Sequence, residues 1–350
     1  MSHPLLGKRL AGKYELVALA GEGGMAEVFR AVTHGVAGFR RPVAIKRVLE
    51  HLSEDQEFLD MFVEEARVMA ALQHPNIVQI HDFDKDEDGA YFLVMEWIEG
   101  LNHLDWLRSY LSRGEPTPWH LVAAIGIEVL KGLSGAHENQ DAEGNVVPVY
   151  HRDVTPQNIL MGNNGVIRLT DFGLARAMDR ARMTRPQMVK GKLSYLAPEL
   201  TSGADATPQT DIFGVGVVLW EALANRKLFD GDGPLNILTK ISACEVPPLS
   251  EERPDIPRKL HDTVHRALSK DPSERYRSAR SMVRALANIL RMTPESTSAE
   301  VLSKSVKEAR DVLAKRRRPL RTTEDLEVDD LVEVDDQPED GHFPLTRRKE

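Results

Sequence analysis

The chain is poor in cysteine and has no long apolar run. Its 350 residues include one cysteine, Cys244, so no disulfide can form within the chain, as expected in a reducing compartment. No window reaches the roughly 18 apolar residues needed to span a bilayer, and the N-terminus lacks the apolar region of a signal peptide. We therefore expect a cytoplasmic protein with no membrane span.

The chain also lacks an excess of positive charge. Its formal net charge is -9, whereas a nucleic-acid-binding surface is usually basic, so we expect no nucleic acid among its partners. The 41% hydrophobic and 28% charged residues are close to the globular average. A single hydrophobic core usually stops growing near ~250–300 residues, so a chain of this length has room for two packed lobes and a tail.

The first part of the chain has the pattern of a small β-rich lobe. Apolar and β-branched runs separated by glycine or acidic turns predict strands at 14–20, 27–32, 42–48, 76–83 and 91–97. One helix interrupts them, because Ser53 followed by Gln56 has the spacing of a capping box and the helical pattern continues to His74-Pro75. Together these elements predict a strand-rich lobe that carries one helix.

Beyond residue 100 the apolar spacing becomes helical, with short strand-like pieces between Asn158 and Leu169. The helical period is clearest at 120–137, 211–224 and 259–269. After Met292 the chain becomes polar, and a short helix candidate and a basic run precede an acidic stretch of a kind that usually stays disordered. We therefore divide the chain into an N-terminal extension (1–13), a β-rich lobe (14–98), a mainly α lobe (99–292) and a largely disordered acidic tail (293–350).

A glycine-rich turn between the first two strands is the first candidate for ligand binding. Glycine lets backbone N–H groups approach phosphate oxygens, and a strand–turn–strand hairpin can cover them as a lid. An ordinary hairpin turn stays open as the alternative. The turn consists of Gly21, Glu22, Gly23, Gly24, Met25 and Ala26.

A lysine in an apolar strand and a glutamate on an apolar helix face form the second candidate. Lys46 ends the strand sequence Val-Ala-Ile-Lys, and its alternative interpretation is a lysine at a strand end that extends into water. A carboxylate on a packed helix face is costly unless it meets a cation, so we expect Glu65 to pair with Lys46. The apolar residues that share the face of Glu65 are Phe58, Phe62, Met69 and Leu72.

The most specific pattern combines two carboxylates and one amide. Asp153, at the end of His-Arg-Asp, is followed by Asn158 and, thirteen residues after that, by Asp171 of Asp-Phe-Gly. Phosphoryl transfer needs a carboxylate that orients and deprotonates the attacking hydroxyl, and this role suits Asp153. It also needs oxygen ligands for Mg²⁺, a role that suits Asn158 and Asp171.

In this order the motifs resemble those of the eukaryotic-like protein kinases, in particular their bacterial serine/threonine branch. The resemblance extends from Tyr14 to about Met292 and includes Asp211 at the start of an apolar helix, and Glu199 of Ala-Pro-Glu, which the family pairs with an arginine, here Arg275. It implies a bilobal α+β fold with ATP and Mg²⁺ between the lobes, and transfer of the γ-phosphate to serine or threonine of protein substrates. Besides the glycine turn, it implies nucleotide contacts from a gatekeeper, two hinge residues and four apolar residues, namely Met95, Glu96, Ile98, Ala20, Val28, Ala44 and Leu160.

The sequence departs from the family pattern at two linked positions and at Ala26, which replaces a glycine. The lysine that usually follows His-Arg-Asp by two residues is Thr155, whereas the threonine that usually follows the glycine before Ala-Pro-Glu is Lys192. Because the two positions are neighbours in the family, we expect the Lys192 ammonium to return to the space that Thr155 leaves and to stabilise the transferring phosphate. The alternative is that Lys192 points to solvent. Thr155 also weakens the serine/threonine marker.

Regulation and function each leave alternatives open. In related kinases an arginine before the catalytic aspartate binds a phosphate on the activation loop, so with Arg152 present we expect autophosphorylation at Thr184; the alternative is a loop that is ordered without phosphate. A non-catalytic scaffold of kinase fold, or a small-molecule phosphotransferase, is the alternative to a protein kinase. The acidic tail is either a docking segment for partners or a solubilising extension.

Overall fold

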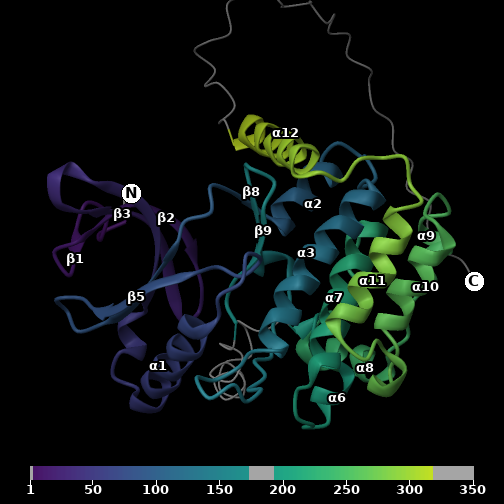
Figure 1. The fold of residues 1–350 in the computed structure, drawn as a ribbon, viewed down its shortest axis with the longest axis horizontal. Helices are drawn as coiled ribbons and strands as arrows, with labels where there is room; N and C mark the ends of the chain where they lie inside the picture. The colour runs from purple at the N-terminus through teal and green to yellow at the C-terminus, as the bar shows by residue number, and fades with distance from the viewer. Residues whose placement is uncertain (1–2, 173–192, 318–350) are drawn as a thin grey trace, which may run out of the picture.

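The computed structural model describes residues 3–172 and 193–317, and these form two lobes (Figure 1). The smaller lobe contains a six-stranded antiparallel sheet in the order β1-β2-β3-β4-β6-β5 and one long helix, α1 (Gln56–Ala71). The bilobal α+β fold predicted from the sequence is confirmed. The strands are β1 (Arg9–Leu10), β2 (Tyr14–Glu22), β3 (Ala26–His34), β4 (Arg40–Val48), β5 (Ile80–Lys85) and β6 (Tyr91–Glu96).

Side chains of β4 alternate between two apolar layers. Val43 and Ile45 pack with Phe29 and Phe92 in a core on one face of the sheet, whereas Ala44 and Val48 belong to the main core that includes the apolar residues of α1. Successive strand residues point to opposite faces, so Lys46 has the same direction as Ala44 and Val48. The strand therefore directs the lysine to the α1 side of the sheet.

The N-terminal cap of α1 is Asp55, whereas the sequence pattern predicted Ser53. The Asp55 carboxylate accepts a hydrogen bond from the Phe58 N–H at 3.0 Å. Ser53 instead ends a short 3-10 turn, Glu50–Leu52, and its Oγ lies 3.4 Å from the Leu49 carbonyl oxygen. Serine and aspartate both suit a cap, and this preceding turn decides where the α-helix begins.

The larger lobe is built around two buried helices, α3 and α7, with α11 packed against α3. A small sheet in the order β7-β8-β9 carries the segment between Asn158 and Leu169, as predicted. Its strands are β7 (Gly100–Asn102), β8 (Ile159–Gly162) and β9 (Ile167–Leu169). The helices are α2 (His103–Leu111), α3 (Trp119–His137), α6 (Pro198–Thr201), α7 (Pro208–Ala224), α8 (Pro234–Ala243), α9 (Leu249–Glu252), α10 (Arg258–Ala267) and α11 (Ala279–Leu290).

The segment assigned to the tail begins with a packed helix. This helix, α12 (Ala299–Arg317), lies across α2 and the small sheet (Figure 1). Leu302, Val306 and Ala309 are at most 4% exposed, so one stripe of an otherwise polar helix is part of the core. The packed part of the chain therefore extends beyond residue 292, and the acidic stretch lies outside the described residues.

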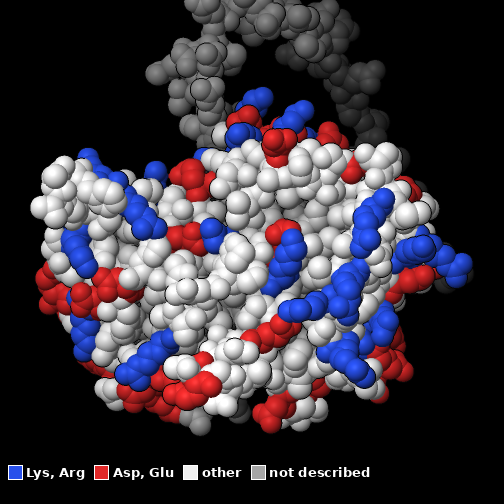
Figure 2. All heavy atoms as spheres, viewed as in Figure 1, with Lys and Arg blue, Asp and Glu red and all other residues white. Residues whose placement is uncertain are grey.

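The surface shown in Figure 2 carries lysine, arginine, aspartate and glutamate side chains in a mixed pattern over both lobes. No broad field of one sign covers this face. Within residues 3–172 and 193–317, no helix combines the length and the apolar character needed to cross a bilayer.

Candidate active site

The predicted phosphate-contacting lysine and a predicted metal ligand meet between the lobes. Lys46 is 8% exposed, and its Nζ donates a hydrogen bond to Asp171 Oδ1 at 2.6 Å. The two residues are 125 positions apart in the sequence and come from different lobes, Lys46 from β4 and Asp171 from the segment after β9. The fold therefore places a cation and a carboxylate at the point where the sequence predicts ATP phosphates.

Asp153 and Asn158 are buried and hydrogen-bonded to each other. Asp153 is 5% exposed and Asn158 is 4% exposed. A short 3-10 turn, Pro156–Asn158, returns the asparagine onto the aspartate, so that Asn158 Nδ2 donates to Asp153 O at 2.8 Å and to Asp153 Oδ2 at 3.1 Å. The amide thus holds the predicted catalytic carboxylate in place.

Two residues of the site have left-handed backbone conformations that favour glycine. Arg152 has φ 65° and Asp171 has φ 62°, and each such conformation costs about 1–3 kcal/mol in a non-glycine residue. Asp211, in the first turn of α7, stabilises the first of them. Its two carboxylate oxygens accept the backbone N–H groups of His151 at 2.9 Å and Arg152 at 2.7 Å.

Asp211 is a functional residue whose role the sequence analysis did not identify. It is 1% exposed, and burial raises the pKa of its carboxyl, but the hydrogen bond from His137 Nε2 at 2.8 Å and the charge of that histidine lower the pKa below its ordinary value. The ionised carboxylate can then accept the loop N–H groups. An aspartate inside an apolar helix was the available signal, because such a group must be paired.

His151 connects the catalytic loop to the segment around Asp171. Its Nδ1 accepts the Asp153 N–H at 3.2 Å, and its Nε2 lies 2.9 Å from the Thr170 carbonyl oxygen. A neutral ring with its proton on Nε2 satisfies both contacts. Burial lowers the pKa of His151, which favours that neutral form. The ring also packs on the buried Phe172, with the ring centres 4.5 Å apart.

The side chains of Asn158 and Asp171 provide the kind of oxygen that Mg²⁺ binds. Because the Asn158 amide nitrogen faces Asp153, its amide oxygen is directed away from that carboxylate. Among the described residues no group of three or more His, Cys, Asp or Glu could hold a metal by itself. Magnesium usually takes one or two carboxylates and completes its shell with water and substrate phosphates.

Comparison with known proteins assigns the family. The model of the protein kinase domain matches residues 14–286. The chain belongs to the protein kinase family. Among curated relatives, the chain is 38% identical over 279 residues to "Tyrosine-protein kinase MasK" of Myxococcus xanthus and 36% identical over 280 residues to "Serine/threonine-protein kinase PrkC" of Bacillus subtilis.

The aligned regions cover 80% and 79% of this chain but only 43% and 40% of MasK and PrkC, so the chain spans less than half the length of these two relatives. Among solved structures, the kinase domain of PknI from Mycobacterium tuberculosis aligns with a TM-score of 0.60 and 27% identity. That alignment covers 82% of this chain and 99% of the PknI domain. The match therefore includes both lobes.

The predicted adenine-contacting residues come from strands of both lobes and from the hinge between them. The hinge, residues 97–99, connects β6 to β7. The Glu96 N–H is bonded to the Gln79 carbonyl oxygen at 2.9 Å, so Glu96 can offer a nucleotide only its carbonyl group. The Ile98 N–H has no hydrogen-bond partner in the described part of the chain and can donate. Ala44 and Met95 are buried, Val28 and Leu160 are half-buried, and Ala20 is exposed.

The glycine turn forms the tip of the β2–β3 hairpin, as predicted. The Gly23 N–H donates to the Ala26 carbonyl oxygen at 3.0 Å, which closes the turn. Met25 packs against the main core, and its carbonyl oxygen accepts the Leu49 N–H at 3.0 Å. Gly21 and Gly23 are exposed, and Gly24 is half-buried. Gly21 and Gly23 therefore lie at the exposed part of the turn, where the Gly23 N–H is already used within the turn.

Two further polar clusters hold the segment that follows residue 192. Arg275 is 2% exposed and binds both carboxylate oxygens of Glu199, at 2.8 Å and 2.7 Å, which is the pairing that the resemblance implies. Sequence reasoning missed the second cluster. Tyr195 Oη donates to Glu221 Oε2 at 2.6 Å, and Lys227 Nζ donates to the same oxygen at 2.9 Å. Burial raises the pKa of Tyr195, which keeps the phenol protonated.

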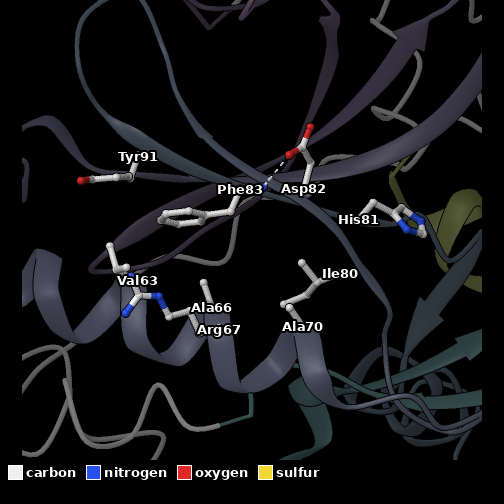
Figure 3. Close-up of a pocket in the computed structure, with 9 residues that line it drawn as sticks. All are labelled: Val63, Ala66, Arg67, Ala70, Ile80, His81, Asp82, Phe83 and Tyr91. Atoms are coloured by element: carbon white, nitrogen blue, oxygen red, sulfur yellow. Dashed lines mark hydrogen bonds between the residues drawn. The ribbon is translucent and has the colours of Figure 1, made fainter. Parts of the chain in front are cut away.

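A cavity of about 380 Å³ lies in the smaller lobe between α1 and the strands β5 and β6 (Figure 3). Ala66 and Ala70 of α1 face Ile80 and Phe83 of β5 across it. None of the lining residues is a predicted nucleotide-contacting or catalytic residue, so this cavity is not the predicted ATP site. The other lining residues are Val63, Arg67, His81, Asp82 and Tyr91.

Three predicted residues cannot be placed. The backbone of Glu65 belongs to α1, but its side chain lies outside the described residues, and the expected pair with Lys46 therefore stays a prediction. Lys192 and Thr184 also lie outside the described residues. The position that the family fills with lysine is described, and there the Thr155 hydroxyl is buried with no hydrogen-bond partner among the described residues.

Proposed function

We propose that the chain is an ATP-dependent protein kinase that transfers the γ-phosphate to serine or threonine hydroxyls of proteins. The observation that carries this proposal is the convergence of Lys46 with Asp171 beside the hydrogen-bonded pair of Asp153 and Asn158. Membership of the kinase family supports it. The full length of the curated relatives is not covered, so the activity is a proposal from the site and the family together.

Each side chain has a distinct task in this proposal. The Lys46 ammonium binds the α- and β-phosphates of ATP, and the Ile98 N–H with the Glu96 carbonyl binds adenine. Asn158 and Asp171 hold Mg²⁺, which supplies positive charge to the phosphate oxygens. Asp153 orients the substrate hydroxyl and accepts its proton as the oxygen bonds to the γ-phosphorus and ADP leaves.

The two curated relatives are named for different classes of accepted hydroxyl. PrkC is named a serine/threonine kinase, whereas MasK is named a tyrosine kinase.

We propose that the Lys192 ammonium supplies the charge that the family places at the position of Thr155. The buried Thr155 hydroxyl, which has no hydrogen-bond partner in the described part of the chain, supports this idea, because an ammonium beside it would give it a donor.

Phosphorylation of Thr184 is proposed as the activating modification. Arg152 lies next to the catalytic Asp153, and within the described residues its guanidinium has no ion-pair partner. A phosphate on the activation loop would supply that partner through charge-assisted hydrogen bonds. Phosphopeptide mapping after incubation with Mg-ATP tests this, and an unmodified segment between Asp171 and Glu199 would contradict it.

The decisive experiment compares the wild type with Asp153→Ala on a protein substrate and on small alcohols. Mass spectrometry then assigns the phosphate to serine, threonine or tyrosine. A protein kinase modifies the protein in an Asp153-dependent manner, and a small-molecule phosphotransferase releases ADP with alcohols alone. A scaffold that presents its acidic tail to partners shows neither reaction, and that result would refute the proposal.

A further inference from the structure

The helix α12 lies outside the region that the kinase family model matches, which ends at residue 286. It crosses α2, β7 and β8 at the top of the larger lobe in Figure 1. β7 directly follows the hinge. The helix is therefore an addition to the kinase domain that packs beside the connection between the lobes.

The packing of α12 is specific. Ser305 of α12 is buried against α2, where Trp106 Nε1 donates to its Oγ at 2.8 Å and Tyr110 Oη lies 3.2 Å from the same oxygen. Trp106 is fully buried. At the start of the helix, a Cβ on Gly165 would lie 1.9 Å from the Ala299 carbonyl oxygen, so only glycine fits there. These contacts hold the helix in one position on the lobe.

Two separate contacts connect α12 to one hinge residue, Glu99. Arg310 Nη2 lies 3.3 Å from Glu99 Oε1. Ser303 Oγ donates to the Asn163 carbonyl oxygen at 2.6 Å, and the Asn163 N–H donates to the Glu99 carbonyl oxygen at 2.8 Å. The helix thus contacts both the side chain of Glu99 and, through Asn163, its backbone.

Glu99 in turn contacts the smaller lobe. Its Oε2 accepts Trp97 Nε1 at 2.9 Å and lies 3.7 Å from Arg30 Nη2 of β3. The Arg30 guanidinium also lies over the Trp97 ring, 5.6 Å from its centre. A single carboxylate therefore joins α12, the hinge and β3, one residue after the Ile98 N–H that is available to adenine.

We propose that α12 is a brace for the hinge and that Arg310 and Ser303 are positioning residues for ATP binding, acting through Glu99. By restricting the hinge, they keep the Ile98 N–H in the orientation that binds a nucleotide, which reduces the entropy lost on binding. The part of this proposal that concerns ATP rests on the proposed kinase function. The restriction of the hinge itself does not.

The test uses the full chain with Arg310→Gln, Ser303→Ala and both together. Lys307→Gln is the matched control, because Lys307 is an exposed cation of the same helix with no ion-pair partner among the described residues. Hydrogen–deuterium exchange at residues 96–102 should be faster in Arg310→Gln and fastest in the double variant, while Lys307→Gln equals the wild type. Arg310→Lys, which keeps the charge, should restore most of the protection.

The KM for ATP should rise roughly two- to five-fold in Arg310→Gln, the size expected for a half-exposed ion pair, with kcat unchanged. Equal hinge exchange in Arg310→Gln and Lys307→Gln overturns the brace. Faster exchange with an unchanged KM overturns its role in ATP binding. A wild type that binds no ATP, together with the expected exchange difference, counts against the kinase function and leaves the brace standing.

Discussion

Lys46 and Asp171 form an ion pair of 2.6 Å that joins the two lobes at the floor of the predicted nucleotide site. Their side chains are 10% and 25% exposed, so the pair is largely shielded from water. In the proposed mechanism both groups bind the nucleotide, the lysine through phosphates and the aspartate through Mg²⁺. Both tasks require the two groups in the same part of the site, and their contact places them there.

The variant Lys46→Met should lower kcat/KM for phosphoryl transfer by roughly 100-fold or more, because one preorganised donor to the reacting phosphates is lost. Lys85→Met is the matched control, since Lys85 is an exposed lysine at the end of β5. Steady-state assays of both variants with a protein substrate check this. Equal rates in Lys46→Met and Lys85→Met would contradict the assigned role.

The sequence differs from the family pattern at both Thr155 and Lys192, and we expect Lys192 to replace the positive charge that is missing at Thr155. Lys192→Met should lower kcat by roughly 10²-fold, and adding Thr155→Lys to that variant should recover most of the loss, because the positive charge returns to the family position. Lys190→Met is the control for a general effect of charge in this segment. If Lys192→Met is as active as Lys190→Met, then Lys192 does not supply the charge that is missing at Thr155.

Much of the fold follows from local sequence patterns. The alternation along β4 sets the direction of Lys46, and a strand with two apolar faces can be recognised from its composition. The order Asp153, Asn158, Asp171 predicts which residues converge, because chemistry restricts the residue types that phosphoryl transfer can use.

The parts that were not predicted depend on contacts between distant segments. Asp211 of α7 accepts a hydrogen bond from the backbone of Arg152, and Glu221 of the same helix accepts one from Tyr195. The packing of α12 could not be recognised because its partners lie far away in the sequence, and Trp106 on α2 is 199 residues from Ser305. The start of α1 depended on the choice between two good caps.

The buried pair of Glu199 and Arg275 predicts a large loss of stability when one partner is removed. Arg275→Met should lower the free energy of unfolding by about 3–5 kcal/mol, because it leaves a largely buried carboxylate without its cation. Adding Glu199→Gln should recover part of that loss. Urea unfolding of the single and double variants measures both effects, and additive losses in the double variant would contradict the coupling.

Because of the buried His103, at the start of α2, we expect the protein to become less stable as the pH is lowered. His103 is fully buried, both ring nitrogens lack a partner among the described residues, and burial lowers its pKa from 6.5 to about 3. Between these values the unfolded chain binds a proton that the folded chain does not, so the stability present above pH 6.5 decreases as the pH falls toward 3. At pH 5 the loss from this residue is about 2 kcal/mol. His103→Phe should therefore lose about 2 kcal/mol less than the wild type between pH 7.5 and pH 5 in urea unfolding, and an identical pH dependence would refute the assignment.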